Sequence, residues 1–322
     1  MGCMAVPGAA EQRVWARLPP GTRVALQGLS PSDLQTLLIC LTRDRVGAIT
    51  PAEVMRRRRA DRFVQPAASD PQRLAATELH LWDRLPADVE RLELSPVSPL
   101  GTCSAVAPVS QNRIVTTSRT SEVVSDSTNA LAVEAALRRG QLPPAADVHL
   151  ATCQRQLRAQ RFRPGMSAHF RLFALASSGR DTGSGRTEAR LLLRHLRFWR
   201  HVLGHLIPSA APKIAVTIWS HHVLAERFHD TVLPALAHDD DSADGLHVEV
   251  VQDPHRQRGR GYYAPAAIMI TAQGRDGDTE LGDGGFTTWT AQLTGNAKER
   301  CLVSCIATER LTDLVSHERS PF

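Results

Sequence analysis

The segment Arg258–Tyr263, with the sequence RGRGYY, leads into an apolar stretch at 266–272 that has the composition of a β-strand. The glycine-rich segment Gly282–Phe286 (GDGGF) follows and is predicted to form a tight turn. A further apolar stretch at 301–306 predicts another strand, and Ala307–Leu311 (ATERL) stands at the start of a predicted helix. Strands joined by short turns pair side by side in antiparallel sheets, so this end of the chain predicts such a sheet.

Outward from this segment, the spacing of apolar residues predicts several more strands and helices. Strands are expected at 89–94, 114–117, 169–175, 214–219 and 248–251, and helices at 129–139, 188–206, 223–237 and 309–315. The strands outnumber clear β-α-β crossovers. The pattern therefore favours an α+β fold with a mixed, mainly antiparallel sheet flanked by helices over a doubly wound parallel sheet.

Residues 1–66 are predicted to form a helical segment that precedes a larger domain at 67–322. Ser30–Asp33 and Thr50–Pro51 are capped helix starts, and Ala67–Pro71 is a break before a third helix. A chain of 322 residues is long enough for one large domain with a small appendage.

Composition excludes wholesale disorder, because 42% of the residues are hydrophobic. The chain carries 38 basic and 33 acidic residues, and this net charge of +5 is weak evidence for nucleic-acid binding. The cluster Arg56–Arg59 has two interpretations that stay open, a solvated helix face or a contact for a polyanion. No apolar run spans a bilayer and residues 1–10 lack a secretory pattern, so we expect a cytoplasmic protein without a membrane segment.

Motifs for metals and for several cofactors are absent from the sequence. The six cysteines are scattered without a C-x-x-C pair, and His221–His222 would point to opposite faces of a strand, so no metal site is predicted. There is no P-loop, no dinucleotide-binding glycine motif and no nucleophile elbow. The glycine-rich stretch Gly179–Arg186 is either a flexible hairpin or an anion-holding loop.

The ordered set formed by Arg258–Tyr263, Gly282–Phe286 and Ala307–Leu311 resembles the catalytic domain of histidyl-tRNA synthetase. It resembles equally the regulatory subunit of ATP phosphoribosyltransferase, and both relatives have the class II aminoacyl-tRNA synthetase fold. The resemblance extends over about residues 70–315. It leaves no residues for an anticodon-binding domain.

Three upstream segments add to this resemblance. Leu85-Pro86 followed by Val89–Pro96 is similar to the helix–strand of class II motif 1 at the family's dimer interface, which implies a homodimer. Ser125–Thr128 resembles the family's R-P-E-G-T segment. Phe170–Arg180 resembles motif 2, a strand–loop–strand whose arginine contacts the α-phosphate of ATP.

The resemblance implies a site for an amino acid or related carboxylate and for ATP with Mg²⁺. Asp126 would hold the ammonium group of the amino acid, and Thr128 would help to position it. Catalytic roles fall to Arg171, Arg258 and Arg310, ATP binding to Arg171, Arg180 and Arg310, and further substrate contacts to Tyr262, Tyr263, Gly284 and Gly285. Adenylation joins two anions, and arginine suits it because the planar, always charged guanidinium binds phosphate through two nitrogens.

Each of these residue types also has a purely structural interpretation. Arg171 would be an ordinary strand-edge arginine, Asp126 the N-cap of the following helix, and the two tyrosines part of the packing of a sheet. Gly284 and Gly285 would simply form a tight turn.

Departures from the family pattern argue against full histidyl-tRNA synthetase activity. Phe173 stands where the family's motif 2 has an adenine-reading glutamate, and Ser304 and Thr308 replace glycines of motif 3. Two functions remain open. The first is a free-standing ligase that forms an acyl adenylate and passes the acyl group to an acceptor other than tRNA. The second is a non-catalytic paralogue that binds an amino acid or nucleotide and regulates a partner enzyme. In neither case do we expect tight tRNA binding.

Overall fold

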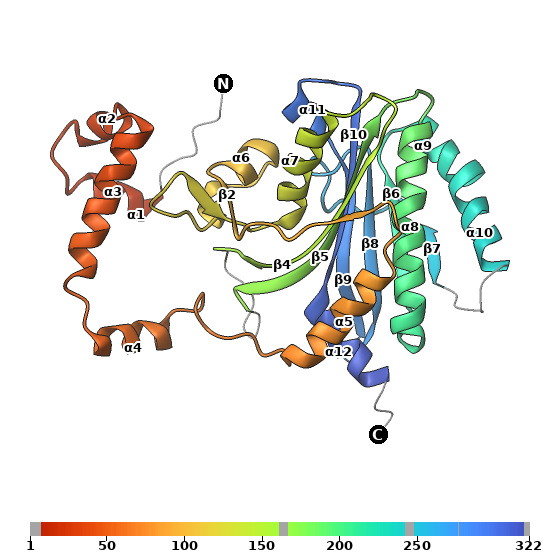
Figure 1. The fold of residues 1–322 in the computed structure, drawn as a ribbon, viewed down its shortest axis with the longest axis horizontal. Coiled ribbons are helices and arrows are strands. Elements are labelled where there is room, and N and C mark those ends of the chain that lie inside the picture. Colours follow the sequence, from red (N-terminus) through yellow and green to blue (C-terminus); the bar gives the residue numbers. More distant parts are fainter. Residues whose placement is uncertain (1–7, 161–166, 242–247, 276, 319–322) are drawn as a thin grey trace. The chain divides into compact units, whose positions relative to one another are not determined.

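The computed structural model describes residues 8–160, 167–241, 248–275 and 277–318 (Figure 1). Within it the chain forms two compact units, residues 1–60 with 116–121 and residues 61–115 with 122–322. None of the helices in the described part of the chain is long and apolar enough to cross a membrane.

The first unit contains four helices: α1 (Ala9–Trp15), α2 (Thr22–Gln27), α3 (Pro31–Val46) and α4 (Pro51–Ala60). The start of α3 lies at the predicted cap, where Ser30 Oγ accepts a hydrogen bond from the backbone N–H of Asp33 (3.1 Å). No residue of these four helices is buried.

The second unit is built on an eight-stranded sheet. Its strands, in spatial order, are β1 (Glu90–Arg91), β4 (Val148–Leu157), β5 (His169–Arg180), β10 (Glu299–Ala307), β9 (Gly277–Thr287), β8 (Ala266–Gly274), β6 (Lys213–Ile218) and β7 (Glu249–Gln252). The five inner pairings are antiparallel, and only the outermost pairs β1–β4 and β6–β7 are parallel. The predicted mixed, mainly antiparallel sheet is therefore confirmed.

Helices cover both faces of this sheet (Figure 1). One face packs against α6 (Thr102–Val106), α7 (Ser127–Arg139) and α11 (Trp289–Thr294). The other face packs against α5 (Pro71–Asp83), α8 (Arg186–Leu206), α9 (His222–Arg227), α10 (Leu233–Asp241) and α12 (Thr308–Glu318). A π-helical turn, Phe228–Val232, joins α9 to α10, and β2 (Val97–Pro99) and β3 (Ser121–Val123) form a separate two-stranded sheet.

Two apolar cores result, one on each face of the sheet. Side chains alternate along β5, so Phe173 and Leu175 join the core beneath α8 while Leu172 and Ala174 join the core beneath α7. Trp82, Phe198 and Trp199 surround the ring of Phe173, with centroids 4.7, 5.9 and 6.3 Å away. This alternation decides which β5 side chains can reach the α7 face.

Three predictions from the sequence are wrong in detail. Residues 169–180 form one unbroken strand, antiparallel to β4, and therefore contain no strand–loop–strand. Gly284 and Gly285 lie inside β9 rather than in a turn. The stretch 114–117 is not a strand.

Candidate functional site

A cleft of about 800 Å³ opens on the α7 side of the sheet. It is bordered by the start of α7, the loop 258–263, parts of β5, β9 and β10, and the first turns of α12. The charged side chains that line it are Arg113, Arg158, Arg258, Arg310, Asp126, Glu280, Asp283, Glu309 and Asp313. The cleft is large enough for a small organic ligand of the size that enzymes usually bind.

Asp126 links the start of α7 to the cleft. As the N-cap of α7, its Oδ1 accepts hydrogen bonds from the backbone N–H (3.0 Å) and the hydroxyl (2.7 Å) of Thr128. Its Oδ2 accepts one from Arg158 (3.2 Å) and a long one from the Tyr262 hydroxyl (3.4 Å). Asp126 is thus the N-cap of α7 and also lines the cleft. Thr128 is buried and directs its hydroxyl to Asp126.

Tyr262 and Tyr263 line the cleft together because of the loop that precedes them. Gly259 and Gly261 both have positive φ angles (87° and 89°), which glycine adopts without strain. The backbone N–H groups of both tyrosines donate to the carbonyl of Gly259, at 3.0 and 2.8 Å. Their rings meet edge to face with centroids 4.9 Å apart, and burial raises the pKa of both hydroxyls well above the usual value, so both stay neutral.

Gly284 and Gly285 lie behind the cleft rather than in its lining. A Cβ on Gly285 would stand 2.6 Å from Tyr263 Cγ, and a Cβ on Gly284 would stand 2.4 Å from the carbonyl oxygen of Val303. Gly285 therefore makes room for the ring of Tyr263, and Gly284 permits close approach of β10. In the structure without a ligand, the two glycines thus shape the wall of the cleft but are not among its lining residues.

Arg258 and Arg310 meet at Glu280. Arg258 donates to the Glu280 carboxylate (2.6 Å) and Arg310 to the Glu280 backbone carbonyl (2.6 Å). The ion pair with Glu280 raises the pKa of Arg258, whose side chain is 68% exposed. Arg258 and Arg310, two of the three arginines for which the sequence analysis expected a catalytic role, both line the cleft.

Arg171 and Arg180 are placed away from the cleft. The side chain of Arg171 lies on the opposite face of β5 from Phe170 and Leu172, where it forms an ion pair with Glu78 of α5 (2.7 Å). Arg180 is the last residue of β5 and lies opposite Glu299 of β10. The structure therefore does not bring these two arginines together with the other predicted site residues.

The departures assigned to Phe173, Ser304 and Thr308 do not concern the cleft either. Phe173 is fully buried beneath α8. Ser304 is buried and accepts a hydrogen bond from Trp199 Nε1 (2.8 Å), and Thr308 is buried and donates to Glu78 (3.3 Å). None of the three lines the cleft, so they give no information about how it would bind adenine.

Arg158 is a cleft residue that the sequence reasoning missed. It follows β4 directly, donates to the carbonyl of Ser125 (2.7 Å) and to Asp126, and covers the ring of Phe170 at 5.0 Å. From the sequence, the motif 2 arginine was assigned to Arg171, and Arg158 was not considered. Recognition of β4 as a strand would have identified it.

Asp283 is the second missed residue. It lies in β9 and lines the cleft, 3.8 Å from Arg256 Nη2 and 4.0 Å from Cys305 Sγ. Burial, followed by the negative charge of Asp126, raises the pKa of Asp283 to about 6. Nothing in its sequence context, GDGGF, marks it as more than part of a turn.

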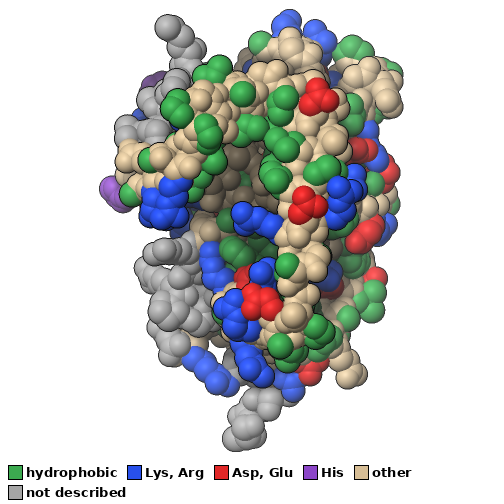
Figure 2. All heavy atoms as spheres, turned by 90° about the vertical axis from the view of Figure 1, so that its left-hand side faces the viewer, with side chains coloured by type: hydrophobic (Ala, Val, Ile, Leu, Met, Phe, Trp, Pro, Cys, Tyr) green, Lys and Arg blue, Asp and Glu red, His purple; other side chains and the backbone are tan. Residues whose placement is uncertain are grey.

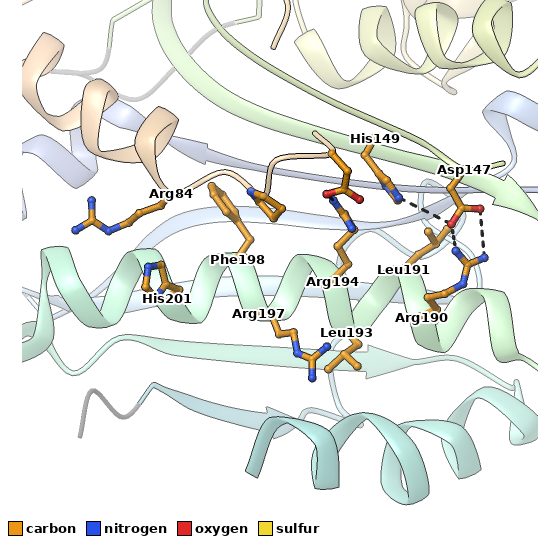
Figure 3. A pocket seen from close by; sticks show the side chains of 12 residues that line it. Arg84, Asp147, His149, Arg190, Leu191, Leu193, Arg194, Arg197, Phe198 and His201 are labelled. Atoms are coloured by element: carbon orange, nitrogen blue, oxygen red, sulfur yellow. Dashed lines mark hydrogen bonds and ion pairs between the residues drawn. The ribbon is translucent and has the colours of Figure 1, made fainter. Parts of the chain in front are cut away.

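A second cavity, of about 680 Å³, lies beside α8 on the other side of the sheet (Figure 3). Arg190 and Arg194 of α8 form ion pairs there with Asp147 and Asp88. Behind them, hydrogen bonds connect His149 to Ser177 (2.8 Å) and Ser177 to the buried His195 (2.9 Å). None of the site residues predicted from the sequence lines this cavity, so the cleft is the stronger candidate.

No group of three or more His, Cys, Asp or Glu residues placed to hold a metal ion occurs in the described ranges. No family model matches the chain, and no curated protein matches it significantly.

Solved structures do match the chain. Histidyl-tRNA synthetase from S. aureus in its apo form is 14% identical, with 77% of this chain and 66% of that one covered and a TM-score of 0.55. A histidine–tRNA ligase subunit from Alicyclobacillus acidocaldarius is 13% identical, with 80% and 96% covered and a TM-score of 0.56. An ATP phosphoribosyltransferase regulatory subunit/histidyl-tRNA synthetase from Bacillus halodurans is 11% identical, with 78% and 82% covered and a TM-score of 0.55.

These similarities and the observed sheet agree with the resemblance seen in the sequence, although the chain spans just under two thirds of the S. aureus synthetase. At such low identity the shared property is the fold. The chain has the class II aminoacyl-tRNA synthetase-like fold that histidyl-tRNA synthetases share with the ATP phosphoribosyltransferase regulatory subunit.

Proposed function

We propose that this protein is a free-standing ligase that activates an amino acid or similar carboxylate with ATP and transfers the acyl group to an acceptor other than tRNA. The observation that carries the proposal is that Asp126, Tyr262 and Tyr263 line the same cleft as Arg258 and Arg310. An acid for a substrate ammonium group and cations for phosphates thus share one cavity.

The reaction in this cleft would be a displacement at the α-phosphorus of ATP. A carboxylate oxygen of the substrate forms a bond to the α-phosphorus, the bond from that phosphorus to the bridging oxygen breaks, and pyrophosphate leaves. Arg158 and Arg258 would stabilise the charge that develops on the α-phosphate oxygens, and Arg310 would hold the outer phosphates. Asp126 would fix the ammonium group so that the carboxylate points at the phosphorus.

The residues present fit ATP accompanied by Mg²⁺. Magnesium in nucleotide sites is usually bound by phosphate oxygens together with one or two carboxylates. Glu309, beside Arg310 at the start of α12, is an available carboxylate, and it already pairs with Arg155 (2.9 Å). The ion would neutralise part of the triphosphate charge within a cleft that contains acids as well as arginines.

The proposal of an acceptor other than tRNA rests on charge. Side chains of both signs are interspersed with apolar ones on the face drawn in Figure 2, rather than forming one basic surface. With a net charge of +5, we expect no tight, sequence-selective tRNA binding. Nanomolar affinity for one tRNA species at physiological salt would contradict this.

A homodimer is part of the proposal. The short strand β1 (Glu90–Arg91), within the segment similar to motif 1, forms an outer edge of the sheet and is exposed. Exposed sheet edges offer unpaired backbone groups to another chain. Sedimentation should therefore give about twice the chain mass of 35.2 kDa at micromolar concentration, and a mass near that of one chain would contradict the dimer.

We also propose a cytoplasmic location. ATP-dependent activation needs a nucleotide pool, and the five cysteines among the described residues are free thiols, as is usual in a reducing compartment.

One observation favours the alternative, a non-catalytic amino-acid- or nucleotide-binding paralogue that regulates a partner enzyme. Five acids and four arginines line the cleft, and Arg258 and Arg310 already contact Glu280. With this balance of charges a triphosphate would need Mg²⁺ to neutralise part of its charge, whereas an amino acid would not. A screen of amino acids for substrate-dependent exchange of pyrophosphate into ATP separates the two functions, since only the ligase supports exchange.

A further inference from the structure

We infer that the substrate of this cleft carries a second cationic nitrogen in its side chain, and that Asp283 binds it. This inference rests on the proposed function, because it assumes that the cleft receives an amino acid whose α-ammonium group meets Asp126. It names the class of amino acid that the cleft binds and assigns its recognition to Asp283, a residue that the sequence motifs did not single out.

The first argument is the weak pairing of Asp283. Its nearest cationic atom is Arg256 Nη2 at 3.8 Å, too far for a hydrogen bond, and the thiol of Cys305 at 4.0 Å is a poor donor. The side chain is 29% exposed, and it lines the cleft. A carboxylate in this position retains acceptor capacity for a ligand.

The second argument is that the other cleft acids have closer partners. Asp126 accepts from Thr128 and Arg158, Glu280 pairs with Arg258, and Glu309 pairs with Arg155. Asp313 lies exposed on α12. Asp283 is therefore the partly enclosed acid with the least compensation.

The charged groups that face Asp283 come from every element around it. Burial has the largest effect on its pKa, followed by Asp126 of the α7 cap, while Arg256 and Arg258 from the loop lower the pKa and Glu280 of β9 raises it. The net result is a pKa of about 6 for the Asp283 carboxyl. The two arginines therefore do not cancel the rise in this pKa that burial and the neighbouring acids cause. A ligand cation would stabilise the charged form.

Arg256 offers a different explanation, in which Asp283 merely neutralises a buried guanidinium. However, Arg256 directs its other nitrogens to the carbonyls of Arg258 (2.9 Å) and Ile268 (2.9 Å), and its Nη2 has no hydrogen-bond partner. The two side chains form a long ion pair at 3.8 Å without a hydrogen bond. A role limited to neutralisation predicts that Asp283→Asn lowers stability and affects all ligands alike.

The test is calorimetric binding of a ligand series to the full-length protein at pH 7.5. Diaminobutyrate, ornithine and lysine carry the second ammonium group, and 2-aminobutyrate, norvaline and norleucine are their respective neutral counterparts. Wild type should bind one of the diamino acids at least tenfold more tightly than its neutral counterpart, because hydrogen bonds to charged groups contribute about 1.5–3 kcal/mol. Asp283→Asn should remove this preference and leave neutral amino acids unaffected.

Asp313→Asn is the matched control, since it removes a carboxylate at the rim of the same cleft and should keep the preference. Thermal melting of both variants shows whether they fold. Binding of the preferred diamino acid should also weaken as the pH falls through about 6, where Asp283 becomes protonated, with no comparable change for neutral ligands.

Equal affinity for charged and neutral ligands, or a preference that survives in folded Asp283→Asn, would overturn the inference. So would an absence of diamino-acid binding by folded wild type. Pyrophosphate exchange tests the underlying function separately. Selective binding of a diamino acid without exchange would refute the ligase function but keep the inference about Asp283. Exchange with neutral amino acids alone would support the ligase function and refute the inference about Asp283.

Discussion

Replacement of Asp126 by alanine and by asparagine separates its two roles. Asp126 caps α7 by accepting from the backbone N–H of Thr128, and it faces the cleft beside Arg158 and Tyr262. Asparagine caps helices about as well as aspartate, whereas alanine cannot. Both variants remove the negative charge that would meet a substrate ammonium group.

The expected magnitudes follow from these contacts. Asp126→Ala should lower the free energy of unfolding by about 1 kcal/mol through loss of the cap, and Asp126→Asn should stay close to wild type. The ion pair with Arg158 does not contribute to the difference between the two variants, because both lose it. Affinity for the amino acid should fall about 10- to 150-fold in both, since a hydrogen bond to a charged group contributes about 1.5–3 kcal/mol.

Urea unfolding and calorimetric titration of the two variants measure the two effects independently. If Asp126→Asn binds the amino acid as tightly as wild type, the carboxylate does not hold the ammonium group and the residue is only a helix cap. If instead Asp126→Asn loses as much stability as Asp126→Ala, the capping argument is wrong.

Three further outcomes are expected. Arg258→Ala should slow adenylation roughly 100- to 1,000-fold with little change in amino-acid affinity or melting temperature, and unimpaired exchange would exclude this arginine from the reaction. Gly285→Ala should destabilise the fold by about 1–3 kcal/mol, because its Cβ would meet Tyr263 and the carbonyl of Ala266 at 2.6 Å, and an unchanged urea midpoint would refute that clash. Burial lowers the pKa of His149 to about 4 and that of His195 to about 3, so below pH 6.5 the unfolded protein binds more protons than the folded protein. The free energy of unfolding should therefore fall by up to about 1.4 kcal/mol per pH unit for each histidine between pH 6.5 and 5. Urea unfolding that gives the same free energy across this range would contradict the prediction.

The sequence predicted most of the regular elements of the second unit. Helix α8, expected at 188–206, is Arg186–Leu206, and β10, expected at 301–306, is Glu299–Ala307. Such segments have strong periodicity or long apolar runs, which local sequence reports directly. Strand β4 was missed because its sequence, VHLATCQRQL, mixes polar residues into positions that are mostly buried.

The missed strand also affected the candidate site, and two other differences have separate causes. Without β4, the motif 2 arginine was assigned to Arg171, although strand alternation directs it away from the cleft and Arg158 lies there instead. Gly284-Gly285 was interpreted as a turn because glycine pairs usually mark turns, whereas here close approach of Tyr263 and β10 requires them within a strand. The environment of Asp283 depends on residues far apart in the chain, so no local pattern could have indicated it.

The central claim is that the cleft activates a carboxylate. Incubation of the protein with ATP, Mg²⁺, labelled pyrophosphate and each of a panel of amino acids, the diamino acids included, tests it most directly. Our account predicts label entering ATP in the presence of one amino acid or a small related group, and no label without it. A folded protein that binds an amino acid yet exchanges no pyrophosphate with any member of the panel would contradict the claim.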